Sequence, residues 1–224
     1  NKTIFFWNNR NARRKQSGTI IWWFKEFLDQ VGHDKASLIM HTDPKDENGQ
    51  DLNVIIHELG LSNSRSVLIS QDKLPPQHLA ALYSAVDCVI NISDAEGFGL
   101  GTLESLACET PIIVNMTGGL QEQVTDGKEW FGVGIIPASK TIIGTQQVPY
   151  IYEDRIAKED FISALKTMHN MTPTERAEMG RKGREHIMKN YNFEEYKTKW
   201  VELLTSVHER YGSWDTRKNY KSWE

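Results

Sequence analysis

The sequence has few cysteines and no long apolar run. Its two cysteines, Cys88 and Cys108, lie in apolar segments, which indicates small buried side chains in a reducing compartment rather than a disulfide framework. No apolar run approaches the roughly 18 residues that span a bilayer, and no signal peptide opens the chain. We therefore expect a cytoplasmic protein, with peripheral membrane contact left open.

Several catalytic and cofactor motifs are also absent. The seven histidines form no metal-binding pattern and no Asp-x-Asp motif occurs, so we expect no metal site. Neither a Walker A motif nor a Gly-x-Ser-x-Gly motif is present. The segment after the first expected strand has no glycine before Gly18, which argues against a dinucleotide-binding oxidoreductase. A net charge of −4 provides no general attraction for nucleic acid.

Strand and helix patterns alternate along the chain, which predicts βαβ units and a parallel sheet. The length of 224 residues suits one domain or two small ones. Expected strands cover residues 3–8, 36–41, 66–70, 87–92, 111–115 and 133–136. Expected helices cover 18–31, 52–59, a segment after 75–76, 102–108, a short segment from 118–119, and 160–170.

Two capping patterns predict the C-terminal helices. Thr172 and Glu175 enclose Pro173 as a capping box, and Asn192 precedes a long amphipathic segment. From this pattern we expect the chain to be helical from Ala157 to its end. The connection 134–154 has few periodic signals and is read as a functional loop, a packed excursion or an edge strand.

The most informative segment, 94–106, combines two carboxylates with several glycines between an expected strand and an expected helix. A helix N-terminus presents free N–H groups that suit a phosphate, and glycines let a ligand approach the backbone. The carboxylates of Glu96 and Glu104 can accept hydrogen bonds from sugar or ribose hydroxyls. The segment therefore predicts a sugar-nucleotide site, although acidic residues that offset a helix dipole would give a similar pattern.

A basic loop, 8–15, follows the first expected strand. Ligands of open α/β sheets bind beyond the carboxyl ends of strands, so this loop should face the Glu96 turn across a crevice. Cations there would face the phosphate of such a ligand. A solvated basic loop or a small nucleic-acid patch is the alternative.

The Glu-x7-Glu spacing around Gly-Phe-Gly-Leu resembles the retaining GT-B glycosyltransferases of the GT4 group, and the likeness continues through residues 83–119. The resemblance implies the C-terminal, donor-binding half of a GT-B enzyme, an α/β fold with a Rossmann-like parallel sheet flanked by helices and followed by terminal helices. It implies a nucleotide-sugar-binding domain over 1–190. The helix and tail 191–224 would then cross to an N-terminal acceptor domain that is missing from this chain.

The resemblance also implies residue roles. Arg10 and Lys15 would contact the donor diphosphate and Glu96 the transferred sugar, although the loose spacing leaves Arg13 and Arg14 open for the role of Lys15. The other implied donor contacts are the backbone N–H groups of Phe98, Gly99 and Leu100, the side chains of Thr102 (phosphate) and Glu104 (ribose), and Gln71 and Leu74 (base).

The function expected from these residues is that of a retaining glycosyltransferase. It would transfer a sugar from a UDP-, GDP- or ADP-linked donor to a hydroxyl acceptor, without a cofactor. Two alternatives stay open: a sugar-nucleotide epimerase or hydrolase on the same scaffold, and a non-catalytic nucleotide-binding module.

Overall fold

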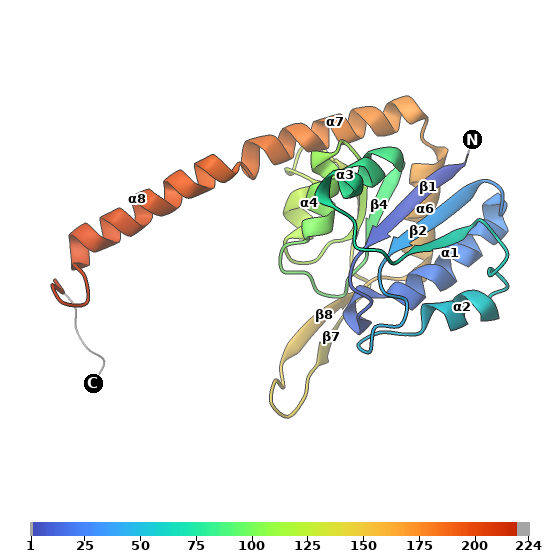
Figure 1. Cartoon of the computed structure of the whole chain (residues 1–224), viewed down its shortest axis with the longest axis horizontal. Helices are drawn as coiled ribbons and strands as arrows, with labels where there is room; N and C mark the ends of the chain where they lie inside the picture. Colours follow the sequence, from blue (N-terminus) through green and yellow to red (C-terminus); the bar gives the residue numbers. More distant parts are fainter. Residues whose placement is uncertain (1, 219–224) are drawn as a thin grey trace. The chain divides into compact units, whose positions relative to one another are not determined.

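The computed structural model describes residues 2–218, and its main feature is a six-stranded parallel sheet with helices on both faces (Figure 1). The strand order is β3-β2-β1-β4-β5-β6. The predicted Rossmann-like fold is therefore confirmed, with several strand ends moved by about one residue. The strands are β1 (Thr3–Asn8), β2 (Ala36–His41), β3 (Val67–Ser70), β4 (Cys88–Asn91), β5 (Ile112–Asn115) and β6 (Gly132–Ile135).

Helices α1 (Ser17–Val31), α2 (Leu52–Glu58) and α6 (Lys158–Asn170) cover one face of the sheet. The other face carries α3 (Pro76–Ala85), α4 (Leu100–Ala107) and α5 (Leu120–Val124). Because both faces are covered, the strands read as nearly continuous apolar runs rather than alternating ones. On the first face, Phe5 of β1 packs edge-on against Phe24 and Phe27 of α1.

The order of the strands reverses between β1 and β4. The chain proceeds outward from β1 to β2 and β3, then crosses back to β4 on the other side of β1. The loops after β1 and β4 therefore diverge to opposite faces of the sheet. Such a divergence leaves a crevice at the carboxyl ends of the two strands, where ligands of open α/β sheets bind.

The connection after β6 contains a separate antiparallel hairpin, β7 (Ser139–Ile143) and β8 (Ile151–Arg155). The hairpin forms its own two-stranded sheet and is not an edge strand of the main sheet, so that one of the three interpretations of the sequence is wrong. Three hydrogen bonds to Asp154 anchor its base: Asp154 N donates to the carbonyl of Asp94 (2.7 Å), Asn115 Nδ2 donates to the Asp154 carbonyl (2.7 Å), and Thr117 Oγ1 donates to the Asp154 carboxylate (2.8 Å). Tertiary contacts thus hold in place a segment whose sequence shows little periodic pattern of its own.

The C-terminal helices are α7 (Pro173–Asn190) and α8 (Phe193–Tyr211). The predicted capping box is confirmed, since Glu175 N donates to Thr172 Oγ1 and Thr172 N to the Glu175 carboxylate. By its contacts the chain divides into Asn1–His186 and Ile187–Glu224. The expectation of helix to the end is wrong for residues 212–218, because Gly212 ends α8 with a φ of 76°. The remainder of the predicted tail, 219–224, lies outside the described residues.

Apolar side chains of α8, such as those of Phe193 and Trp200, are exposed in the structure. Among residues 2–218, none of the helices is both long enough and apolar enough to cross a bilayer.

Candidate functional site

The loops that follow β1 and β4 enclose a cavity of about 500 Å³ at the reversal point of the strand order. The cavity has cations on one side and the glycine-rich turn on the other. It is lined by Asn8, Asn9, Arg10, Lys15, Leu79, Glu96, Gly97, Phe98, Gly99, Leu100, Gly101 and Glu104.

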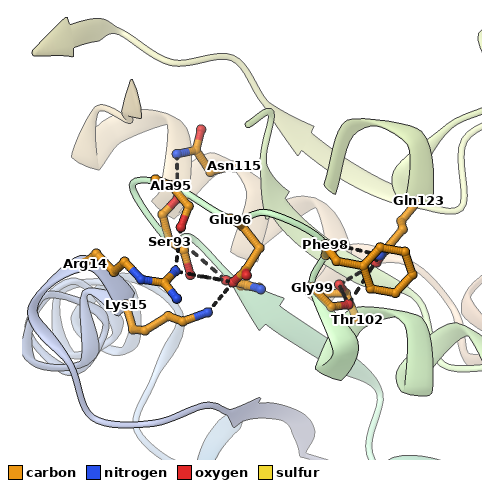
Figure 2. Close-up of polar contacts among 11 residues, drawn as sticks. Arg14, Lys15, Ser93, Ala95, Glu96, Phe98, Gly99, Thr102, Asn115 and Gln123 are labelled. Atoms are coloured by element: carbon orange, nitrogen blue, oxygen red, sulfur yellow. Dashed lines mark hydrogen bonds and ion pairs between the residues drawn. The ribbon is translucent and has the colours of Figure 1, made fainter. Parts of the chain in front are cut away.

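The basic loop turns inward through a short 3₁₀ helix, η1 (Arg13–Lys15), which Gln16 ends in a left-handed conformation with a φ of 58°. This turn directs Lys15 into the interior, where its ammonium forms an ion pair with the Glu96 carboxylate (Figure 2). The neighbouring Arg14 donates to the carbonyl of Ala95 at 2.6 Å and lies 3.7 Å from the same carboxylate. Glu96 is therefore held between two cations.

The Lys15–Glu96 pair is nearly enclosed, with side chains 9% and 11% exposed. Burial lowers the pKa of the Lys15 ammonium, and the hydrogen bond and charge of Glu96 oppose that shift. The pair leaves room for a ligand, because both residues also line the cavity. This geometry suits a cation that stabilises negative charge while its carboxylate partner accepts hydrogen bonds from hydroxyls.

Arg10 lies at the mouth of the cavity and is 63% exposed. Its guanidinium binds Asp46 through two contacts, Nε to Oδ2 at 2.6 Å and Nη2 to Oδ1 at 3.2 Å. These hydrogen bonds raise the pKa of Arg10 and hold the pKa of Asp46 well below its usual range. An anion that bound here would share the guanidinium with Asp46.

Arg13 points away from the cavity. It binds Glu153 of β8, a carboxylate that is 1% exposed and also lies 3.2 Å from Arg155. Burial of Glu153 is thus offset by two guanidinium groups, whose hydrogen bonds lower its pKa. Arg13, Arg14 and Lys15 were the candidates for the second diphosphate contact. Of these three residues Lys15 lines the cavity, whereas Arg13 connects the basic loop to the hairpin.

The turn before α4 exposes the start of that helix to the cavity. Its N-cap, Gly99, has a φ of 88° and no capping side chain. Gln123 of α5 lies beneath the turn with no exposed surface, and its amide nitrogen donates to the carbonyl of Phe98 at 2.6 Å (Figure 2). Thr102 Oγ1 lies 2.6 Å from Gln123 Oε1. These buried bonds fix the turn so that the first N–H groups of α4 are available to an anion.

Gly118 lets the next loop approach the Glu96 turn. A Cβ atom at this position would lie 1.8 Å from the carbonyl oxygen of Glu96, and the φ of 48° is left-handed. Gly119 N donates to that same carbonyl at 3.3 Å. The backbone of the turn is therefore supported directly by the backbone of residues 118–119.

Most predicted site residues meet at this cavity. Arg10, Lys15, Glu96, Phe98, Gly99, Leu100 and Glu104 line it. Thr102, Gln71 and Leu74 do not: the Thr102 hydroxyl is buried against Gly99 and Gln123, and the other two lie beyond β3. Their predicted donor contacts, like those of the lining residues, stay predictions.

Sequence reasoning placed Asn8 in the basic loop but gave it no role, and it missed Leu79 as a lining residue and Gln123 as a support. Gln123 left a usable signal, since it is a polar residue between Leu120 and Val124 on the buried side of α5. Leu79 left none, because it is an ordinary apolar position of α3.

A larger cavity, of about 660 Å³, lies at the amino ends of β4 and β5, where Asp87, Cys108 and Arg176 line it. Ligands of parallel α/β sheets bind at the opposite, carboxyl ends, so the smaller cavity is the candidate site. Within residues 2–218 no cluster of three or more histidine, cysteine, aspartate or glutamate side chains is arranged to hold a metal ion.

Comparison with known proteins supports the resemblance inferred from the motif. A family profile described as "Glycosyl transferases group 1" matches residues 3–168. A D-inositol 3-phosphate glycosyltransferase of Corynebacterium jeikeium is 33% identical over 106 residues, which cover 46% of this chain and 25% of that relative.

Two solved structures share the fold. The sucrose-phosphate synthase of Thermosynechococcus elongatus superposes with a TM-score of 0.72 at 21% identity, over 93% of this chain and 46% of that one. An E. coli structure described as trehalose-6-phosphate bound with UDP-2-fluoro glucose gives 0.68 at 13% identity, over 92% and 45%. The chain thus spans less than half the length of these relatives.

Proposed function

We propose that this chain supplies the donor site of a retaining glycosyltransferase. The chain belongs to the glycosyl transferases of group 1. The observation that carries the proposal is the cavity at the strand-order reversal, where Arg10 and Lys15 lie opposite Glu96 and Glu104. A nucleoside diphosphate sugar matches this arrangement of cations, helix N–H groups and carboxylates.

In the proposed complex the diphosphate lies between the basic loop and the start of α4. Glu96 accepts hydrogen bonds from the transferred sugar and Glu104 from the ribose. The bond between the anomeric carbon and the leaving phosphate oxygen breaks, and its electron pair stays with the diphosphate. Arg10 and Lys15 stabilise the charge that grows there.

The acceptor hydroxyl would attack the same face of the sugar and give its proton to the leaving phosphate, which keeps the anomeric configuration. The chain spans less than half the length of the relatives it matches. We propose that a second domain binds the acceptor. UDP is our first candidate nucleotide, because the similar E. coli structure is described with a UDP-linked sugar.

Isothermal titration calorimetry with UDP-, GDP- and ADP-glucose tests the proposal. At least one should bind, and Arg10→Ala should weaken the nucleoside diphosphate by about tenfold while leaving the nucleoside unchanged. Lys45→Ala is the matched control, since Lys45 is an exposed cation of a nearby loop that pairs with Asp51 and does not line the cavity. Failure of all three donors to bind would overturn the proposal.

Product analysis with the complete enzyme separates the alternatives. A glycoside with retained configuration supports the transferase. An epimerised or free sugar with no glycoside would favour an epimerase or hydrolase on the same scaffold.

A further inference from the structure

The hydroxyl of Tyr83 lies between two residues of the candidate site. Asn8 Nδ2, at the end of β1, is 2.8 Å from Tyr83 Oη, and Tyr83 Oη is 3.0 Å from Glu104 Oε2. Tyr83 comes from α3 and is 1% exposed, whereas Glu104 is exposed beside the cavity. Three separate elements thus meet at one phenolic oxygen.

The chemistry of the three groups fixes the direction of both bonds. An ionised carboxylate can only accept, so the Tyr83 O–H must donate to Glu104. The oxygen of that hydroxyl can then only accept, which requires the donating NH₂ of Asn8 on its other side. Burial raises the pKa of Tyr83, so the hydroxyl keeps its proton at any working pH.

Packing holds the hydroxyl in place. The Tyr83 ring stands edge-on against Phe6, with centroids 5.3 Å apart. At Gly101, in the first turn of α4, a Cβ atom would lie 3.1 Å from the carbonyl of Asn8 and 3.3 Å from Tyr83 Oη. The helix that carries Glu104 is therefore packed directly onto this pair.

Within residues 2–218, Tyr83 is the only side chain that hydrogen-bonds the Glu104 carboxylate. It engages Oε2 and leaves Oε1 to a ligand in the cavity. We propose that Tyr83 is a positioning residue that orients Glu104 toward the ribose diol, and that this contact makes the site select ribonucleoside diphosphates over nucleotides that lack the 2′- and 3′-hydroxyls. The inference rests on the proposed function, because it assumes a nucleotide in this cavity.

The test uses calorimetric titration of the wild type, Tyr83→Phe and Glu104→Ala with whichever of UDP, GDP and ADP binds the wild type best, and with its 2′,3′-dideoxy counterpart. The measured quantity is the ratio of the two affinities. Tyr83→Phe keeps the ring against Phe6 and should lower ribonucleotide affinity by about tenfold, with the dideoxy affinity within about twofold of wild type. Tyr150→Phe, an exposed tyrosine of the hairpin, is the control that should change neither value.

Asn8→Asp provides a second variant that reverses the bond direction. A carboxylate at position 8 would draw the Tyr83 proton away from Glu104, so the affinity ratio should fall as in Tyr83→Phe even if added negative charge weakens both ligands. This variant also serves if Tyr83→Phe does not fold.

The outcomes separate the two proposals. Ribonucleotide binding that is lost in Glu104→Ala but unchanged in Tyr83→Phe and Asn8→Asp overturns the positioning role and leaves the donor site standing. Equal weakening of both ligands in Tyr83→Phe, with no change of ratio, also overturns it in favour of a structural role. Absence of binding of all three nucleotides to the wild type overturns the donor site and this inference with it.

Discussion

The ammonium of Lys15 and the carboxylate of Glu96 form an ion pair beside the candidate donor cavity. The pair joins the loop after β1 to the loop after β4, and its two side chains are nearly enclosed. It therefore supports the crevice as well as lining it.

Removing either partner should destabilise the fold. We expect Lys15→Met to lower the free energy of unfolding by about 1–3 kcal/mol, because Glu96 keeps only the more distant Arg14 as a cation. The double variant with Glu96→Gln should lose less than the sum of the two single losses in urea unfolding. Lys25→Met, which breaks the exposed pair with Asp29, is the control and should change stability by less than about 0.5 kcal/mol. Additive losses would contradict the coupling.

Asp46 should moderate anion binding by Arg10. Asp46→Asn removes the competing charge but keeps an oxygen for the turn at Asn48. We expect nucleoside diphosphate to bind a fewfold more tightly, about threefold, with a steeper dependence on salt. Titration calorimetry at two salt concentrations measures both. Asp43→Asn removes one negative charge from the same loop without touching Arg10. An equal gain in nucleotide affinity in this variant would show that the overall charge of the loop, and not the contact with Arg10, limits binding.

Gln123 should hold the turn before α4. Gln123→Leu leaves the Phe98 carbonyl and the Thr102 hydroxyl without their buried partner, so we expect a loss of about 2–3 kcal/mol in unfolding free energy. Amide hydrogen exchange across residues 98–102 should accelerate. Gln121→Leu, an exposed position of the same helix, should leave both measurements near wild type. Equal effects of the two variants would argue against a specific support.

Gly118 should be required for the close approach of its loop to the Glu96 turn, and Gly127 provides the control. Both have a left-handed φ, but only at Gly118 would a Cβ atom meet a backbone carbonyl. Gly118→Ala should cost about 2–4 kcal/mol and weaken nucleotide binding, whereas Gly127→Ala should cost about 1–2 kcal/mol and leave binding unchanged. Thermal unfolding and calorimetry give the two readouts, and similar costs would contradict the crowding.

His169 should make stability depend on pH. Burial, with the charge of Arg176, lowers the pKa of His169, whose Nδ1 lies 2.9 Å from Thr3 Oγ1. Because its folded pKa lies below the unfolded value near 6.5, its contribution is complete above that pH and is lost as pH falls through the folded value. The urea midpoint should therefore drop from pH 7.5 to 5.0 by more in the wild type than in His169→Gln. An equal drop in both proteins would rule out His169 as the source.

Local patterns predicted most of the fold. The strands, the Thr172–Glu175 capping box and the Asn192 cap follow from residue spacing within a few positions, so each could be read from a short stretch of sequence. The hairpin was missed because its two strands are mostly exposed and lack the buried apolar runs of the main sheet, and because its base is held by Asn115 and Thr117, which are distant in sequence. Gly212 ended the last helix before the expected point.

By itself, the sequence determined the alternating architecture, the family motif around Glu96 and Glu104, and the placement of a basic loop at a strand end, because these depend on side-chain type and spacing along one segment. Only the tertiary structure decided which basic residue enters the cavity, that Arg13 binds Glu153 instead, and that Tyr83 and Gln123 support the turn. Those choices depend on the left-handed turn at Gln16 and on distances between elements that share no local pattern.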